Sequence, residues 1–75
     1  MSAARLIHMA NQIAEAFKVL PEAEAIAATE DHIRKFWDPR MRQRLYTNAM
    51  ADGEALSAIA RSAVMRICGN AQGRD

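Results

Sequence analysis

The stretch HIRKFWDPRMRQR, residues 32–44, decides how the chain folds because it contains a forced break between two helices. The residue before a proline is disfavoured in helical backbone angles, so Asp38 should end the helix that precedes it. An aspartate is also a preferred N-cap, and Pro39 suits the first position of a new helix. The sequence therefore predicts a sharp corner after Trp37, where one helix ends and another begins.

Further breaks divide the rest of the chain. Leu20-Pro21 and Asp52-Gly53 are turn signals, and Gly69 opens a polar end. Between the breaks, apolar residues recur at three- and four-residue steps, and no segment alternates as a strand does. The expected helices cover about residues 3–19, 21–38, 39–50 and 54–68, and Ser2 is the expected N-cap of the first.

These patterns predict an all-α fold, a small bundle of about four short helices. A single domain over residues 1–69 is followed by a frayed, flexible tail at residues 70–75. The residues expected on the apolar faces are Leu6, Met9, Ile13, Phe17 and Leu20; then Ile26, Ile33, Phe36 and Trp37; then Met41, Leu45 and Ala49; and finally Leu56, Ile59, Ala60, Ala63 and Ile67.

The core of this bundle should be thin. Of the 75 residues, 51% are hydrophobic, but sixteen of those are alanines, which favour helix and bring little area to a core. A single core of this size rarely supplies more than about 3–5 kcal/mol. A partner protein would supply the missing apolar contacts.

Charge is concentrated in one place although the net charge is only +1, since five of the ten basic residues lie between Arg34 and Arg44. Two of the five, at positions 34 and 35, have an acid four residues earlier, at Glu30 and Asp31, in the favourable order for surface pairs. The other three, at positions 40, 42 and 44, occupy the start of a helix, where positive charge opposes the helix dipole. Either acids of the same chain fold back onto these three arginines or an acidic partner compensates them.

Phe36 and Trp37 pose a related question because neighbouring helical residues point about 100° apart. Both rings can be enclosed only if this helix end is covered on two sides. Trp and Arg are also the residue types that most often dominate interfaces. We therefore expect a partner-facing patch, with Trp37 as its apolar anchor and charge-assisted hydrogen bonds from Arg40 and Arg42. The candidate partner-binding residues are Arg34, Phe36, Trp37, Pro39, Arg40 and Arg42.

No catalytic, cofactor-binding or metal-binding residues are expected in the chain. His8, His32 and Cys68 do not have the spacing of metal ligands, and the three glycines form no phosphate-binding loop. Both histidines are interpreted as solvated, and the cysteine as a small residue at a helix end. A lone cysteine cannot form an internal disulfide, and no run reaches membrane-spanning length, so we expect a cytoplasmic protein without a membrane partner.

Three stretches together resemble a known family: HMANQI (residues 8–13), HIRKFWDPRMR (32–42) and DGEAL (52–56). They are similar to the delta subunit of the cytoplasmic, molybdenum-dependent, NAD-linked formate dehydrogenases, over about residues 8–64. The resemblance implies a small accessory subunit of a complex that oxidises formate to carbon dioxide and reduces NAD. It also implies that the molybdenum cofactor, iron–sulfur clusters and FMN lie in the larger subunits, and that this chain binds the catalytic alpha subunit and supports assembly or stability.

Two alternatives remain open from the residues themselves. A small helical nucleic-acid-binding module would present Arg40, Arg42 and Arg44 to phosphates, although the small net charge and the few basic residues elsewhere argue against it. Self-association through exposed apolar stripes would instead give a helical homo-oligomer.

Overall fold

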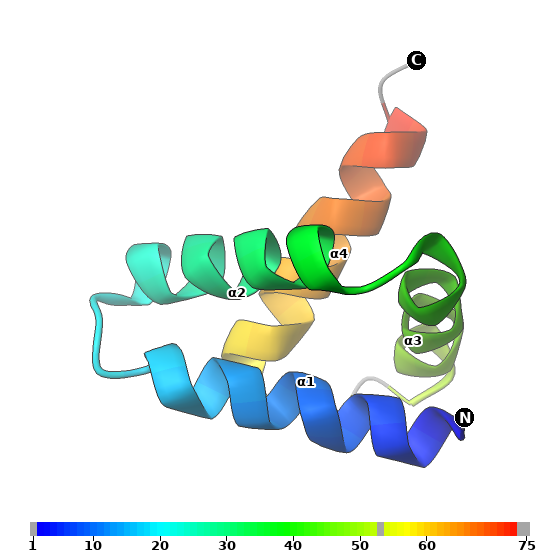
Figure 1. Cartoon of the computed structure of the whole chain (residues 1–75), viewed down its shortest axis with the longest axis horizontal. Coiled ribbons are helices and arrows are strands. Elements are labelled where there is room, and N and C mark those ends of the chain that lie inside the picture. The colour runs from blue at the N-terminus through cyan, green and yellow to red at the C-terminus, as the bar shows by residue number, and fades with distance from the viewer. Residues whose placement is uncertain (1, 53, 74–75) are drawn as a thin grey trace.

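The chain forms a small bundle of helices. A computed structural model describes residues 2–52 and 54–73, with side chains through residue 68. The helices are α1 (Ala3–Phe17), α2 (Glu22–Phe36), α3 (Pro39–Ala51) and α4 (Ala58–Gly73), and no strand occurs in the described ranges. Helices α1 and α2 lie side by side in opposite directions, α4 crosses behind them, and α3 packs near the start of α1 (Figure 1). The predicted all-α fold is confirmed.

The corner between α2 and α3 forms as the proline rule predicts. Helix α2 ends at Phe36, and Trp37 has extended backbone angles. The Asp38 carboxylate then accepts a hydrogen bond from the backbone N–H of Met41 at 2.9 Å, and Pro39 occupies the first turn of α3. This cap satisfies one of the backbone donors that a helix start leaves unpaired.

Helix α4 differs from the prediction at both ends. It begins four residues after the expected Glu54, because Ser57 caps it and its Oγ accepts from the Ala60 backbone N–H at 3.3 Å. It also continues past Cys68, so the first part of the expected tail is helical. Residues 74–75, the remainder of that tail, lie outside the described residues.

The starts of α1 and α2 agree closely with the sequence. The Ser2 hydroxyl accepts a hydrogen bond from the Arg5 backbone N–H at 3.2 Å, which confirms it as the N-cap of α1. Pro21 precedes the first residue of α2, one position earlier than an N1 proline, and Glu22 and Glu24 occupy the first turn. Negative charge at this end complements the helix dipole.

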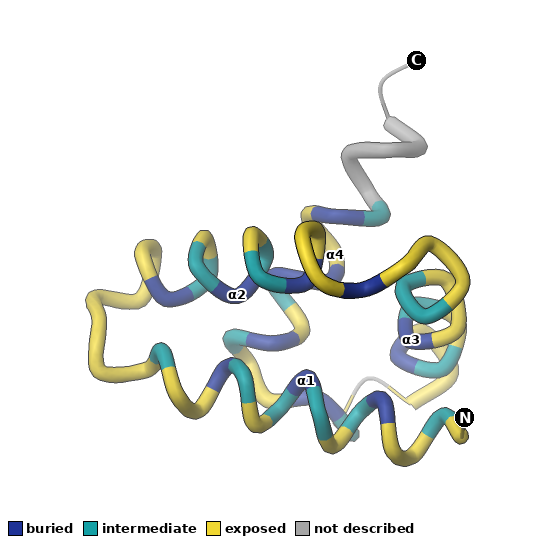
Figure 2. The backbone as a smooth tube through the Cα atoms, viewed as in Figure 1, coloured by how far each residue is buried: buried dark blue, intermediate teal, exposed yellow. Residues whose placement is uncertain are grey.

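The core lies where the four helices meet, and much of it is alanine. In Figure 2 the buried positions of α1 and α2 lie on the sides that face α4 and each other. Six of the thirteen buried hydrophobic residues described are alanines, which let the helix backbones approach closely. The central cluster consists of Leu6, Ala10, Ala14, Ile33, Trp37, Leu45, Ala49, Leu56, Ala60, Val64 and Ile67.

The expected apolar faces are confirmed for α3 and α4 and need correction for α1 and α2. On α1 the fully buried line is Leu6, Ala10 and Ala14, while the larger Met9, Ile13 and Phe17 are only half-buried. Two residues expected on buried faces, Leu20 and Phe36, are exposed. Two of the three innermost residues of α1 are alanines, whose small side chains allow neighbouring helices to approach closely.

Asn11 connects α1 to the segment between α3 and α4. Its Nδ2 donates to the Ala55 carbonyl at 3.0 Å, and its Oδ1 accepts from the Ser57 backbone N–H at 2.8 Å. One side chain thus fixes two backbone groups of the segment that leads into α4. No local pattern in the sequence indicates this contact, since the partners are more than forty residues apart.

Candidate docking surface

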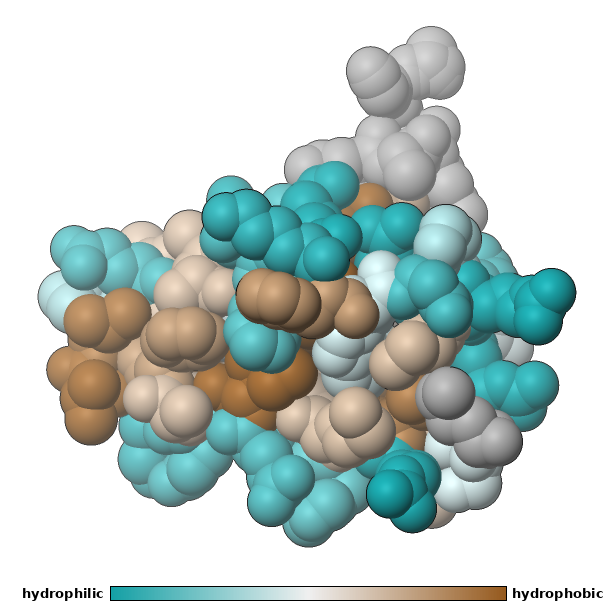
Figure 3. Space-filling model, in the orientation of Figure 1, coloured by the Kyte–Doolittle hydropathy of each residue, from teal (hydrophilic) through white to brown (hydrophobic). Residues whose placement is uncertain are grey.

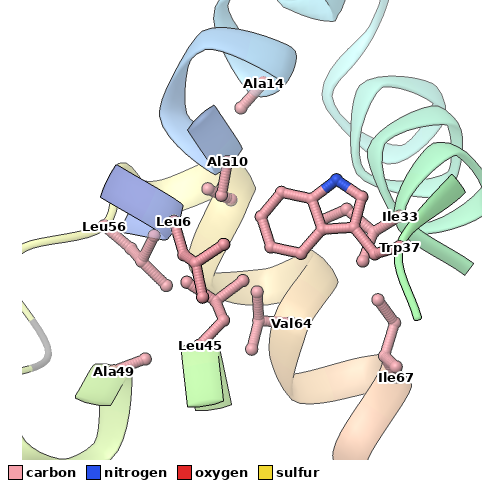
Figure 4. Packing of buried hydrophobic residues seen from close by; sticks show 11 residues of the cluster. Leu6, Ala10, Ala14, Ile33, Trp37, Leu45, Ala49, Leu56, Val64 and Ile67 are labelled. Carbon is pink, nitrogen blue, oxygen red and sulfur yellow. The ribbon is translucent and has the colours of Figure 1, made fainter. Parts of the chain in front are cut away.

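Trp37 lies in the core. Its side chain is 5% exposed, and the indole ring reaches toward Leu6 and Ala10 of α1, with Val64 of α4 nearby (Figure 4). Trp37, which we expected to be an apolar anchor for a partner, is thus a core residue, because α1 and α4 cover most of its ring. The indole Nε1 donates no hydrogen bond to any described residue, and it is not among the buried side-chain atoms that lack a partner.

Phe36 is the exposed member of the aromatic pair. It is 71% exposed, and its ring centroid lies 4.7 Å from that of His32. The imidazole in turn lies 6.5 Å from the ring of Phe17 on α1, in an edge-to-face arrangement. His32, interpreted from the sequence as solvated, is thus half-buried between two aromatic rings that connect α2 to α1.

An apolar hollow lies beside these rings, between α1 and α2. Its volume is about 390 Å³, and its lining includes Met9, Ile13 and Phe17 of α1, together with His32 and Trp37. Hydrophobic surface gathers in this region and at the turn that joins the two helices (Figure 3). We call this region the α1/α2 hollow. The sequence did not reveal it, because it depends on which half-buried residues two separate helices bring together.

The α1–α2 turn extends this apolar surface. Val19 is 86% exposed and Leu20 is 37% exposed. Exposed apolar side chains that stand alone are common, whereas those that adjoin an apolar hollow are typical of interaction sites.

The basic residues near the corner do not form one patch with the aromatic residues. The Arg34 Nε lies 3.0 Å from Glu30, which confirms the predicted pair, and Lys35 pairs with Asp31 at 3.2 Å. Glu30 also forms an ion pair with Arg66 of α4, at 2.9 Å. The spacing of residues along the chain does not indicate this contact. The two oxygens of a single carboxylate therefore serve two guanidinium groups from different helices.

Arg40, Arg42 and Arg44 form no ion pair with any residue in the described ranges. Of the nearby acids, Asp38 caps α3 and Asp31 pairs with a lysine. The reading in which acids of the same chain fold back onto these arginines finds no support in the described residues. Arg40 and Arg44 are exposed and Arg42 is half-buried.

Cys68 is half-buried on α4, away from the helix end at which it was expected. Burial raises the pKa of its thiol, and the positive charges of Arg42 and Arg34 partly oppose that rise. Both guanidinium groups therefore act on the same sulfur. The thiol is kept in its protonated, less nucleophilic form.

The described residues contain no group of three potential metal ligands, and none of their helices has the length and apolarity needed to cross a bilayer. His8 is exposed on α1.

The sequence model of one protein family matches residues 5–64, most of the chain. That family is the NADH-dependent formate dehydrogenase delta subunit, FdsD. The chain belongs to this family. No curated protein and no solved structure matches it.

The resemblance seen in the sequence is therefore confirmed, and membership makes the chain a subunit of formate dehydrogenase, with other subunits of that complex as its partners. The match includes the residues that line the α1/α2 hollow, the aromatic pair and the arginines at positions 34 to 44. It gives no support to the nucleic-acid alternative.

Proposed function

We propose that the chain is a non-catalytic subunit that binds the large catalytic subunit of formate dehydrogenase and supports the assembly or stability of the complex. In this proposal the molybdenum cofactor, iron–sulfur clusters and FMN all reside in the partner subunits. Family membership supports the choice of formate dehydrogenase as the complex, because a delta subunit is one of its subunits.

One observation indicates which surface binds the partner: an exposed phenylalanine lies beside an apolar hollow on a very small domain. Phe36 is 71% exposed, and His32 links it to the lining of the α1/α2 hollow. Burying a phenylalanine side chain contributes roughly 1.5–3 kcal/mol. Phe36 therefore replaces Trp37 as the proposed apolar anchor.

The hollow also offers a polar group for orientation. The Trp37 indole lines it, and the indole N–H donates to no described residue. A carbonyl group of the partner that reached into the hollow would accept a hydrogen bond from this N–H. An indole N–H that becomes buried normally has such an acceptor. Trp37 thus keeps a place in the proposed interface through its N–H edge alone.

The test is the Phe36→Ala substitution in the tagged, full-length chain expressed in its native cell. We expect at least about tenfold weaker retention of the catalytic subunit, because truncating an interface anchor typically costs 2 kcal/mol or more. The measurement is the amount of catalytic subunit that co-purifies. The matched control is Met50→Ala, which removes an equally apolar side chain that is 56% exposed and does not line the hollow.

Two results would contradict the proposal. Equal retention by Phe36→Ala and Met50→Ala would remove the hollow from the interface, and capture of no formate dehydrogenase subunit by the unaltered chain would remove the docking function. Deletion of the chain separates its roles: loss of the complex indicates assembly, and slower formate-dependent NAD reduction by an intact complex indicates modulation.

A further inference from the structure

A second surface, separate from the α1/α2 hollow, carries an excess of positive charge. The Nε atoms of Arg34 and Arg66 lie 3.0 Å and 2.9 Å from the two oxygens of Glu30, whose side chain is 12% exposed. The arginine side chains themselves are 42% and 51% exposed. One carboxylate between two guanidinium groups leaves a net charge of +1 on this group.

Arg42 adds a third guanidinium group from a third helix. Its charge and that of Arg34 act on the thiol of Cys68 on α4. Arg42 has no ion pair within the described residues. Arg34 of α2 is thus linked to both other helices: it shares Glu30 with Arg66 of α4, and it acts with Arg42 of α3 on the same thiol.

We propose that Arg34, Arg42 and Arg66 form a receptor for an acidic segment of a partner subunit, and that Glu30 occupies part of this receptor until the partner binds. The proposal rests on the proposed function in that the partner is another formate dehydrogenase subunit. It concerns a different face and a different chemistry from the anchor at Phe36.

The geometry of the arginines favours carboxylates. Arg34 and Arg66 each use Nε toward Glu30. Their Nη groups donate no hydrogen bond to any described residue, and a guanidinium offers its remaining donors as a fork that matches a carboxylate. Because these groups are only half exposed, a partner acid would displace little water and interact through a less screened field than at a fully exposed site.

The charge distribution favours a protein segment over a nucleic acid. A polyanion that extended beyond the receptor would meet the acids of α2, including Glu22, Glu24 and Asp31, and the whole chain has a net charge of only +1. A short acidic segment can contact the arginines without extending to Glu22 and Glu24 at the start of α2. Specific nucleic-acid binding normally needs a broader basic face.

The first experiment substitutes Arg42→Gln in the tagged, full-length chain, captures the formate dehydrogenase subunits from the native cell and washes with rising NaCl. We expect about tenfold weaker retention at low salt and release at a lower NaCl concentration, since a hydrogen bond to a charged group is lost. Arg5→Gln, which removes an exposed arginine of α1, is the matched control and should behave as the unaltered chain.

The second experiment substitutes Glu30→Gln, for which the proposal requires effects of opposite sign on stability and binding. Loss of the ion pair between α2 and α4 should lower the melting temperature of the free chain. Loss of the competing carboxylate should at the same time hold the partner subunits to a higher NaCl concentration. A merely structural role for Glu30 would lower both.

Each outcome decides the matter. If Arg42→Gln and Arg34→Gln release the partners at the same NaCl concentration as Arg5→Gln while Phe36→Ala still loses them, the receptor is refuted and the proposed function stands. If Glu30→Gln weakens retention, its role as a competitor is refuted. If the unaltered chain captures no subunit, both proposals fail. In that case, duplex DNA binding that weakens with salt and is abolished by Arg42→Gln would show that the arginines bind nucleic acid.

Discussion

At the scale of single residues, the surroundings of Cys68 determine its chemistry. Burial raises the pKa of the thiol, and the charges of Arg42 and Arg34 moderate the rise without cancelling it. The folded chain therefore holds the thiol proton at pH values where the unfolded chain has released it. A cysteine in such surroundings is a packing residue, whereas reactive cysteines have a lowered pKa.

This raised pKa predicts a loss of stability at alkaline pH. A group whose pKa is higher in the folded state contributes stability below its unfolded pKa, and that contribution falls as pH rises through the ordinary thiol range of about 8–9 and above. The urea midpoint of the unaltered chain should thus fall more between neutral and alkaline pH than that of Cys68→Ala. Parallel pH profiles for the two chains would show that the folded-state pKa is not raised.

At the scale of elements, Asn11 links stretches of sequence that resemble the family. It lies within HMANQI on α1, and it binds backbone groups at Ala55 and Ser57, one within DGEAL and one just after it. The third stretch contributes Trp37, which packs against α1 and α4. The stretches of this chain that resemble the family thus supply contacts that join its helices.

We predict that Asn11→Ala lowers the free energy of unfolding by about 1–3 kcal/mol, because it leaves the part-buried Ala55 carbonyl without its donor and the exposed Ser57 N–H without its acceptor. Asn11→Asp should not restore stability, since a carboxylate can accept from Ser57 but repels the Ala55 carbonyl oxygen. The measurement is urea denaturation followed by circular dichroism. His8→Ala on the exposed side of the same helix is the control, and an equal midpoint for both alanine variants would show that the link contributes nothing.

At the scale of the whole molecule, stability depends on few large side chains. Six buried alanines bring the helices close but add little apolar area, so the burial of Trp37 is a large share of the whole. A domain of this size supplies about 3–5 kcal/mol from its core. Loss of one central ring would remove a free energy of the same magnitude.

We therefore expect Trp37→Ala, which costs about 3–5 kcal/mol, to unfold the isolated chain. Phe36→Ala at the neighbouring, exposed position should change the free energy of unfolding by no more than about 0.5 kcal/mol. Thermal melts followed by circular dichroism compare the two. A cooperative melt for Trp37→Ala at the temperature of the unaltered chain would mean that the indole is not part of the core.

The sequence predicted local features well and tertiary ones poorly. The corner at Asp38-Pro39, the cap at Ser2 and the two pairs at four-residue spacing depend on neighbours along the chain, and all are present. The choice of Trp37 over Phe36 for the core depends on where α1 and α4 cross the end of α2. The contact between Glu30 and Arg66 likewise depends on helix packing, which a periodic pattern does not specify.

The placement of the chain's one indole, in the core yet lining the α1/α2 hollow, has a practical consequence. A fluorine atom on that ring would give a single nuclear magnetic resonance line from this subunit, however many tryptophans its partners contain. Occupation of the hollow would move that line, while binding confined to the face of α4 would leave it in place. One fluorine label could thus report which side of the molecule contacts a partner inside an assembled dehydrogenase.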